Sequence, residues 1–358
     1  MPDRDPIQEL SATPDRRWTV TDADPTHGSA QSAEDPAEWA EPSPARVQRA
    51  PGPGRPLLAL LAAVIGGAGV AGLAHLAVRT PSGQRLDQLI LTGAQYHEGA
   101  LASLADLASR SVSVPVSIGI LVAALLLVLV RRRPGLLLPL LALVVGANLT
   151  TQVIKHFVLT RDALGPGIEI TPNSFPSGHT TLAAAAMVAL VLASGRLRPV
   201  LALLGAAWTA SVGIGTLVLG WHRPSDVVGA ILVVAAWTFL VLAADGAHTL
   251  SRRAKLARSA ARGGRGRRRA GTPGSDGTLP APTGRLADRI VALLLAAAGI
   301  GGLALGALTA VELQLPLVLT DPAQQDTAYT ATAAVIVGGT SLWMALVLAL
   351  RTPELPRG

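Results

Sequence analysis

The chain has 358 residues, of which 50% are apolar and only 15% are charged, and its mean hydropathy is positive. So few charges are atypical of a soluble protein of this length, and the composition indicates an integral membrane protein. The absence of cysteine excludes disulfides, thiolate metal ligands and a cysteine nucleophile. The net charge of +7 does not indicate a nucleic-acid partner, because nine basic residues fall between Arg252 and Arg269, as expected of a cytoplasmic loop.

Residues 1–55 are rich in Pro, Asp, Glu, Ser and Ala and contain no sustained apolar run. Such a segment buries too little apolar surface to offset chain entropy, so we predict a disordered cytoplasmic tail. Beyond it, apolar residues collect in runs of roughly twenty, the length that crosses the ~30 Å hydrocarbon core as a helix. We predict an all-α, polytopic transmembrane helical bundle with eight spans: 56–78, 112–130, 135–156, 178–195, 199–220, 224–244, 290–311 and 329–350.

The positions of the arginines indicate how the predicted spans are oriented in the membrane, because cytoplasmic loops carry an excess of Lys and Arg. They precede span one, join spans two and three and spans four and five, and follow spans six and eight: Arg46, Arg49, Arg55, Arg131, Arg132, Arg133, Arg196, Arg198, the cluster at 252–269 and Arg351. We therefore expect these segments and both termini on the cytoplasmic side of the cell membrane. The outer side receives 79–111, 157–177, 221–223 and 312–328; the first of these forms either a helix on the outer leaflet or a solvated loop.

Three groups of polar residues lie at the predicted outer ends of spans, where charges are costly and usually have a reason. Lys155 and Arg161 belong to the end of span three and the loop after it. Their charges suit phosphate oxygens, which arginine also binds through its planar fork of donors. Taken alone, they are better explained as anchors at the lipid headgroups.

The second group, Ser177, Gly178 and His179, follows Pro176 and opens span four. A helix N-terminus favours an anion, because its first N–H groups are unpaired and the positive end of the helix dipole lies there. Glycine also lets the backbone approach a phosphate closely. In isolation, a helix cap beside a chance histidine explains these residues better.

The third group is His222 and Asp226, four residues apart at the start of span six, with Arg223 between them. This spacing puts a carboxylate within reach of one imidazole nitrogen, which fixes the tautomer and leaves the other nitrogen free to attack or to take a proton. Such pairs also form structural hydrogen bonds. Two histidines, a carboxylate and several cations around a helix N-terminus are nevertheless the parts needed for phosphoryl transfer through a histidine.

Taken in order, Lys155 to Arg161, the Pro-Ser-Gly-His element ending at His179, and His222 to Asp226 resemble the three-part signature of the type-2 phosphatidic acid phosphatase family. Its superfamily also includes glucose-6-phosphatase and the vanadium haloperoxidases. The resemblance covers about residues 56–245. It implies a six-helix phosphatase core, to which this chain adds two C-terminal spans.

The resemblance implies a role for each matching residue. His222 attacks phosphorus to form a phosphohistidine, Asp226 orients that imidazole, and His179 protonates the departing oxygen and later activates water. Cations and amides hold the phosphate oxygens and stabilise the charge of the transition state; these groups are Lys155, Arg161, Ser177 and the Gly178 backbone amide. Such a scheme uses no metal and no other cofactor.

The sequence departs from the family pattern at two places, both of which concern phosphate binding. Asp162 follows Arg161 where proline is usual, and Gly215 and Thr216 occupy the positions of a Ser-Arg pair before the third-element histidine. One phosphate-binding arginine is therefore missing. We expect Arg223 to supply the cation instead; otherwise the activity is weakened or lost.

The sequence therefore predicts four parts: the tail at 1–55, a membrane phosphatase core at 56–245, a basic cytoplasmic loop at 246–289, and a two-span hairpin with a short tail at 290–358. We expect hydrolysis of a lipid phosphate or diphosphate, such as polyprenyl diphosphate, phosphatidic acid or phosphatidylglycerol phosphate, at the outer face. The alternative is a lipid-phosphate binding or transport protein. A haloperoxidase fits least, because those relatives are usually soluble.

The remaining expectations concern partners and the polar residues of span three. Membrane lipids are expected partners, nucleic acid is not, and the last two spans suit a homo-oligomer or the docking of another protein. Transporters more often carry broken helices and polar residues at mid-membrane. Asn148 and Gln152 are the main polar residues inside span three, and we expect them to form hydrogen bonds between helices.

Overall fold

The computed structural model describes residues 54–96, 113–168, 172–263 and 284–351. All of them belong to one compact unit, Pro51–Gly358. The predicted tail at 1–55 lies outside the described residues except for its last two positions. Within the described ranges all regular secondary structure is helical, in agreement with the predicted all-α class.

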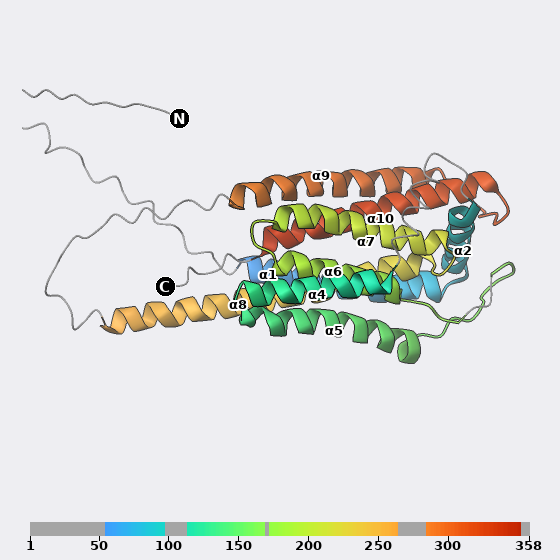
Figure 1. The fold of residues 1–358 in the computed structure, drawn as a ribbon. Coiled ribbons are helices and arrows are strands. Elements are labelled where there is room, and N and C mark those ends of the chain that lie inside the picture. The colour runs from blue at the N-terminus through green and yellow to red at the C-terminus, as the bar shows by residue number, and fades with distance from the viewer. Residues whose placement is uncertain (1–53, 97–112, 169–171, 264–283, 352–358) are drawn as a thin grey trace, which may run out of the picture. The chain divides into compact units, whose positions relative to one another are not determined.

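The helices follow one another along the chain with short connections between most of them (Figure 1). They are α1 (Gly54–Leu73), a π-helical turn η1 (Ala74–Val78), α2 (Pro81–Tyr96), α4 (Val114–Val130), a 3-10 turn η2 (Pro134–Leu136), α5 (Leu137–Val153), a π-helical turn η3 (Ile154–Val158), α6 (Gly178–Ala193), α7 (Arg198–Val218), α8 (Pro224–Gly263), α9 (Gly284–Val311) and α10 (Pro322–Leu350).

Six of these helical segments are long and apolar enough to cross a membrane, which indicates a multi-pass membrane protein. They are Gly54–Val78, Pro134–Val158, Arg198–Val218, Pro224–Lys255, Leu286–Val311 and Pro322–Leu350. The other two predicted spans are also apolar helices, but α4 has 17 residues and α6 has 16. The count of eight spans therefore stays a prediction.

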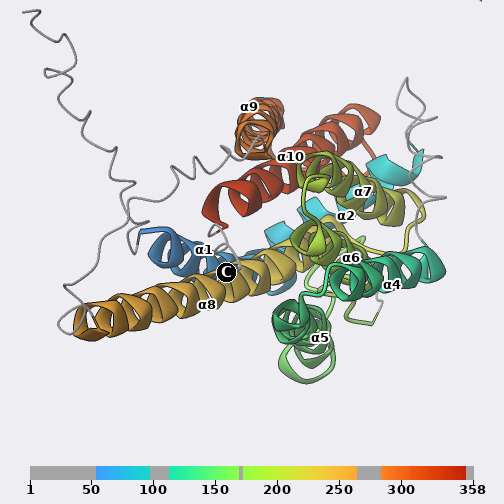
Figure 2. The same ribbon diagram turned by 60° about the vertical axis from the view of Figure 1, so that its left-hand side comes forward.

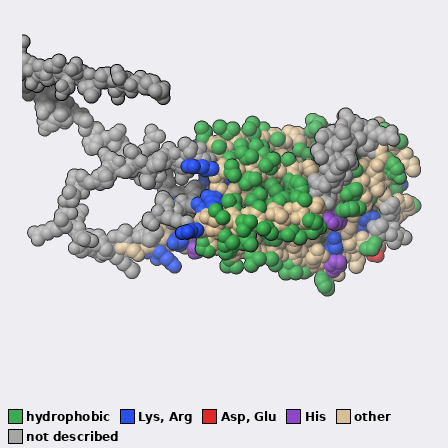
Figure 3. Space-filling model, viewed as in Figure 1, with side chains coloured by type: hydrophobic (Ala, Val, Ile, Leu, Met, Phe, Trp, Pro, Cys, Tyr) green, Lys and Arg blue, Asp and Glu red, His purple; other side chains and the backbone are tan. Residues whose placement is uncertain are grey.

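Hydrogen bonds join helix ends at the end of the bundle where arginines gather. Arg131 Nη1 donates to the carbonyl of Ala193, 3.1 Å away, which joins the last turns of α4 and α6. Arg55 donates to the Arg351 carbonyl, so α1 begins where α10 ends. Figure 3 shows Lys and Arg side chains at this end of a broad apolar band.

The exposed surface of the bundle is apolar while its interior contains many small side chains. Leu138, Leu293 and Val64 are 74%, 71% and 61% exposed, as expected of residues that face lipid. Inside, the alanines of α6 are almost fully buried, and small residues allow helices to approach closely in a membrane. α1 packs along α8, and α10 packs against both α9 and α7 (Figure 2).

The structure differs from the sequence prediction at α8, which continues to Gly263. We expected a basic loop to begin at residue 246, but its first part is the C-terminal extension of this 40-residue helix. A helix of that length spans roughly 60 Å, about twice the hydrocarbon core. Figure 1 shows this extension projecting beyond the neighbouring helices.

The second difference concerns Asn148 and Gln152, for which we predicted hydrogen bonds between helices. The Asn148 amide donates to the carbonyl of Val144, 2.8 Å away, within the same helix. Gln152 Oε1 lies 3.1 Å from Nε2 of His156, one turn further along the chain. Both side chains thus bond locally. The hydrogen bonds between helices are made by neighbouring threonines of α5, since Thr151 bonds to Thr181 of α6 and Thr150 accepts from Trp237 of α8, each at 3.0 Å.

The outer segment at 79–111, for which we left a helix or a loop open, contains helix α2 as far as Tyr96. α2 crosses the end of the bundle opposite the arginine end, and it packs against α10, α7, α8 and η1 (Figure 1). One face is buried, including Gln84, Asp87 and Leu89. α2 therefore belongs to the packed bundle and carries polar groups into it.

Candidate active site

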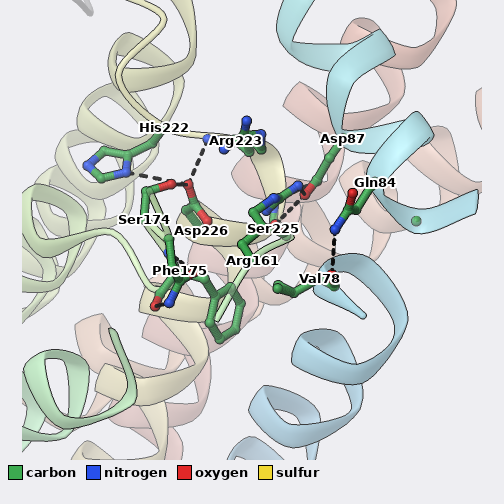
Figure 4. Close-up of polar contacts among 12 residues, drawn as sticks. Val78, Gln84, Asp87, Arg161, Ser174, Phe175, His222, Arg223, Ser225 and Asp226 are labelled. Atoms are coloured by element: carbon green, nitrogen blue, oxygen red, sulfur yellow. Dashed lines mark hydrogen bonds and ion pairs between the residues drawn. The ribbon is translucent and has the colours of Figure 1, made fainter. Parts of the chain in front are cut away.

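The predicted His–Asp pair lies at the start of α8, where Pro224 occupies the first helical position, a common place for proline. His222 Nδ1 is 3.5 Å from Asp226 Oδ2. Asp226 is fully buried, and the same oxygen accepts hydrogen bonds from the Arg223 N–H at 2.9 Å and from the Ser174 hydroxyl (Figure 4). With Nδ1 facing the carboxylate, Nε2 is the ring nitrogen left for chemistry.

The turn that carries His222 is fixed by the last part of α7. The carbonyl of Thr216 accepts from the N–H groups of Trp221 at 3.0 Å and His222 at 3.2 Å. Gly220 has a φ of +69°, a conformation that glycine adopts readily. The buried Thr216 hydroxyl donates to Gly213 within its own helix. At the position where the family pattern has an arginine, the chain therefore has a side chain that bonds within α7, while the backbone carbonyl orients the turn that carries His222.

His179 lies beside this pair. It is the second residue of α6, and its ring centroid is 5.8 Å from that of His222 in an edge-on arrangement. Trp221 lies on another side of the His179 ring, at 5.3 Å. The structure thus brings the two predicted histidines into contact with each other.

The start of α6 is joined to the first turn of α8. The Ser177 N–H donates to the Asp226 carbonyl at 2.8 Å, and the buried Ser177 hydroxyl caps α6 by accepting from Thr180 N–H. Gly178 is not required by packing, because a Cβ there would meet nothing closer than Gln152 Nε2 at 3.9 Å. The glycine therefore leaves space open beside a helix N-terminus, where an anion is favoured.

Two residues that sequence reasoning did not single out hold the loop before α6. The Asn173 amide donates to the carbonyls of Lys155 at 3.1 Å and Leu159 at 3.0 Å, which ties this loop to the end of α5. The Phe175 ring is fully buried against Gly229 of α8, where a Cβ would come within 2.5 Å of the ring. These contacts place the Ser174 hydroxyl against Asp226.

The predicted cations occupy different surroundings. Lys155 lies in η3, half-buried, and its charge interacts with His179 and Asp226. Arg223 contributes its backbone N–H to Asp226, and its side chain is buried. The role of Arg223 as replacement for the missing arginine stays a prediction.

Arg161 pairs with Asp87 of α2, a residue that sequence reasoning missed. Its Nη2 is 3.0 Å from Asp87 Oδ2, and both side chains are almost completely buried. Burial raises the pKa of the Asp87 carboxyl above its ordinary value, while the charge of Arg161 opposes that rise. The only sequence signal was its place as one of three acidic residues, with Glu98 and Asp106, in the segment 79–111, and nothing in the sequence linked it to Arg161.

Within the described residues, no three His, Asp or Glu side chains cluster in a way that could hold a metal ion. Around the N-termini of α6 and α8 lie His179 and His222 together with carboxylates and cations. The fold and the site together define a multi-pass helical membrane protein with a histidine-centred site. Such a site has the components for phosphoryl transfer.

The family model described as the PAP2 superfamily matches residues 135–249. This match confirms the predicted resemblance to the type-2 phosphatidic acid phosphatases. The match contains every residue of the three predicted groups, whereas α1, α2 and α4 lie before it and α9 and α10 after it. Neither the curated proteins nor the solved structures contain a significant match.

Proposed function

We propose that the protein is an integral membrane phosphatase that hydrolyses a lipid phosphate or diphosphate at the outer membrane face through a phosphohistidine. The observation that carries this proposal is the contact of His179 with His222, at 5.8 Å between ring centroids, while Asp226 faces the other side of His222. The superfamily match supports the phosphatase class. The concentration of arginines at the opposite end of the bundle supports the outward orientation.

The geometry suggests a two-step reaction. In the first step, Nε2 of neutral His222 attacks phosphorus, the bond from phosphorus to the lipid oxygen breaks, and protonated His179 gives its proton to that oxygen. Asp226 keeps the Nδ1 proton in place and balances the charge of the phosphohistidine. In the second step, His179 takes a proton from water, the water oxygen attacks phosphorus, and the P–N bond breaks to release inorganic phosphate.

Phosphate oxygens would be held by groups around the start of α6. The Gly178 amide lies at a helix N-terminus, and Lys155 is close enough to influence His179 and Asp226. Preorganised donors of this kind stabilise the charge that develops on equatorial oxygens. Substrates with a headgroup in water and a tail in lipid suit such a site; polyprenyl diphosphate, phosphatidic acid and phosphatidylglycerol phosphate are the candidates.

A second candidate function is binding or transport of a lipid phosphate without hydrolysis. It is favoured by Thr216, because this residue replaces an arginine of the expected signature and its side chain bonds inside α7. Loss of one charged transition-state contact lowers rates by ~10²-fold or more in comparable sites. A protein so weakened would still bind its ligand.

Phosphate release from the candidate lipids by purified protein in detergent, with chelator present, tests the proposal. We expect release by the wild type and a loss on the order of 10³-fold or more in His222→Ala, as removal of a nucleophile produces elsewhere. The matched control is His156→Ala, because His156 lies at the same end of the bundle and bonds only to Gln152 among the described residues. Lipid binding without release by the wild type would favour the second candidate function.

A further inference from the structure

Helix α2 contributes to the site although it lies outside the segment that matches the superfamily. Asp87 on its buried face contacts two partners that belong to that segment. Its Oδ2 accepts from Arg161 Nη2 at 3.0 Å and from the Ser225 hydroxyl at 2.5 Å, and its Oδ1 accepts from the Ser225 N–H at 3.1 Å (Figure 4). One carboxylate thus joins the loop after α5 to the first turn of α8.

The Arg161 guanidinium is held at one edge only. Nη2 is bound to Asp87, whereas Nε and Nη1 are buried and have no hydrogen-bond partner among the described residues. Buried donors are nearly always paired in folded proteins, so two unpaired nitrogens on one planar guanidinium are suited to an anion. The contact with Asp87 holds one end of the buried guanidinium and so restricts the directions in which these donors point.

The backbone around Arg161 is fixed from the same helix. Gln84, three residues before Asp87, donates through Nε2 to the carbonyls of Asp162 and Val78, each 2.8 Å away. Its Oε1 accepts from the Leu164 N–H at 3.0 Å. α2 therefore holds both the side chain of Arg161 and the loop that carries it.

Stability alone gives a weak account of this arrangement. A buried ion pair contributes little net stability, because the desolvation of two charges offsets their attraction. Asp87 also lies near the negative charge of Asp226, which makes its ionised form still more costly. What the pair does provide is direction, because the carboxylate that holds the Arg161 cation also binds Ser225, the residue next to Asp226.

We propose that Asp87 is a positioning residue for phosphate binding, which aligns the free donors of Arg161 and couples them to the start of α8. This inference rests on the proposed function, in which Arg161 binds the phosphate group. By this inference, a helix outside the segment that matches the superfamily takes part in the site. It also predicts that Asp87 acts through Arg161 and not independently of it.

A double-mutant cycle of Asp87→Asn and Arg161→Gln tests the coupling. The readouts are KM, kcat, the inhibition constant of inorganic phosphate, and the midpoint of thermal unfolding. We expect Asp87→Asn to raise KM and the phosphate inhibition constant about tenfold in the wild type and less than about twofold in the Arg161→Gln background, because coupled residues are not additive. Asp162→Asn is the matched control, since it removes one charge from an exposed side chain next to Arg161.

Equal effects of Asp87→Asn in both backgrounds, or a lower unfolding midpoint without weaker phosphate binding, would overturn the proposal. If Asp87→Asn does not fold, Asp87→Glu is the second variant, because it keeps the charge and moves the guanidinium by the length of one methylene. Phosphate binding as tight as in the wild type would then also overturn the proposal. Absence of turnover in the wild type would instead contradict the proposed function. Phosphate binding, measured directly by calorimetry, then still tests Asp87.

Discussion

Asp226 is the residue on which the hydrogen bonds of the site converge. Its Oδ2 accepts from the Arg223 N–H and the Ser174 hydroxyl and faces His222 Nδ1, while its carbonyl accepts from the Ser177 N–H. The buried carboxylate thus joins the turn before α8 to the loop before α6, and the backbone carbonyl of the same residue joins the start of α6. A carboxylate held by several donors keeps its charge and its direction despite burial, which is what an imidazole partner requires.

The residue-scale prediction concerns Ser174, which holds Asp226 from the loop before α6. Ser174→Ala should lower kcat about tenfold or more with little change in KM, because a hydrogen bond to a charged group contributes ~1.5–3 kcal/mol and this one acts on His222, not on substrate. Steady-state kinetics with the best lipid substrate measures the change. Ser82→Ala, at an exposed hydroxyl, is the control; a kcat within twofold of wild type would show that Ser174 does not orient Asp226.

Sequence reasoning found the residues whose chemistry is visible in a short motif. His179, His222 and Asp226 were predicted from residue type and spacing, and the structure brings them together. Ser174 and Asp87 were not predicted, because each acts through a partner far away in the sequence. Contacts of that kind depend on how helices pack, which a single sequence does not reveal.

Among the elements, the packing of α2 against α10 connects the C-terminal hairpin with the site. Leu89 and Ile90 of α2 pack with Ala328 of α10 in one apolar cluster. Gly93 is closest to α10, since a Cβ there would lie 2.3 Å from the Gln325 carbonyl oxygen. From the sequence we expected the last two spans to serve a homo-oligomer or the docking of a partner. In the structure, the C-terminal hairpin also supports the helix that carries Asp87.

The element-scale prediction tests that contact. Gly93→Ala should lower the unfolding midpoint by a few degrees, because a clash with backbone in a packed interface costs ~1–3 kcal/mol and exceeds the helix propensity that alanine gains. It should also raise KM, since α2 shifts away from Arg161. The measurements are thermal unfolding in detergent and steady-state kinetics.

Gly119→Ala is the matched control for this prediction, because Gly119 lies in α4 with nothing within 4 Å of its added Cβ. That variant should unfold no earlier than the wild type. An unchanged midpoint and KM in Gly93→Ala would mean that α2 and α10 separate without cost, and the C-terminal hairpin would then have no part in the site.

At the same scale, the sequence predicted where helices lie better than where they end. Apolar runs located all eight predicted spans as helices, because lipid forces the backbone to satisfy its own hydrogen bonds. The C-terminal extension of α8 was missed because its basic residues fit both a loop and a polar helix. Arginine and lysine favour helix as strongly as most apolar residues do, so charge alone did not mark the end.

For the whole molecule, the contacts at the two ends of the bundle constrain how many helices cross the membrane. Ser177 and Asp226 join the starts of α6 and α8, whereas Arg131 joins the ends of α4 and α6 at the other end. α6 therefore runs the length of the bundle although it has only 16 residues. If α7 and α8 cross the membrane and α6 does not, the Ser177–Asp226 hydrogen bond would have to join opposite sides.

Labelling of single cysteines tests the crossings of α7, α8 and α9 and their orientation, since the natural chain contains no cysteine. The sites are Leu315 between α9 and α10, 84% exposed, Leu197 between α6 and α7, 65% exposed, and Ser259 on the extension of α8. With a membrane-impermeant maleimide on intact cells, we expect Leu315→Cys to react at once, and Leu197→Cys and Ser259→Cys to react only after permeabilisation. The reverse pattern would place the histidine site on the cytoplasmic side. Reaction of Leu197→Cys together with Leu315→Cys would mean that one of α7, α8 and α9 does not cross, because three crossings place these two sites on opposite sides of the membrane.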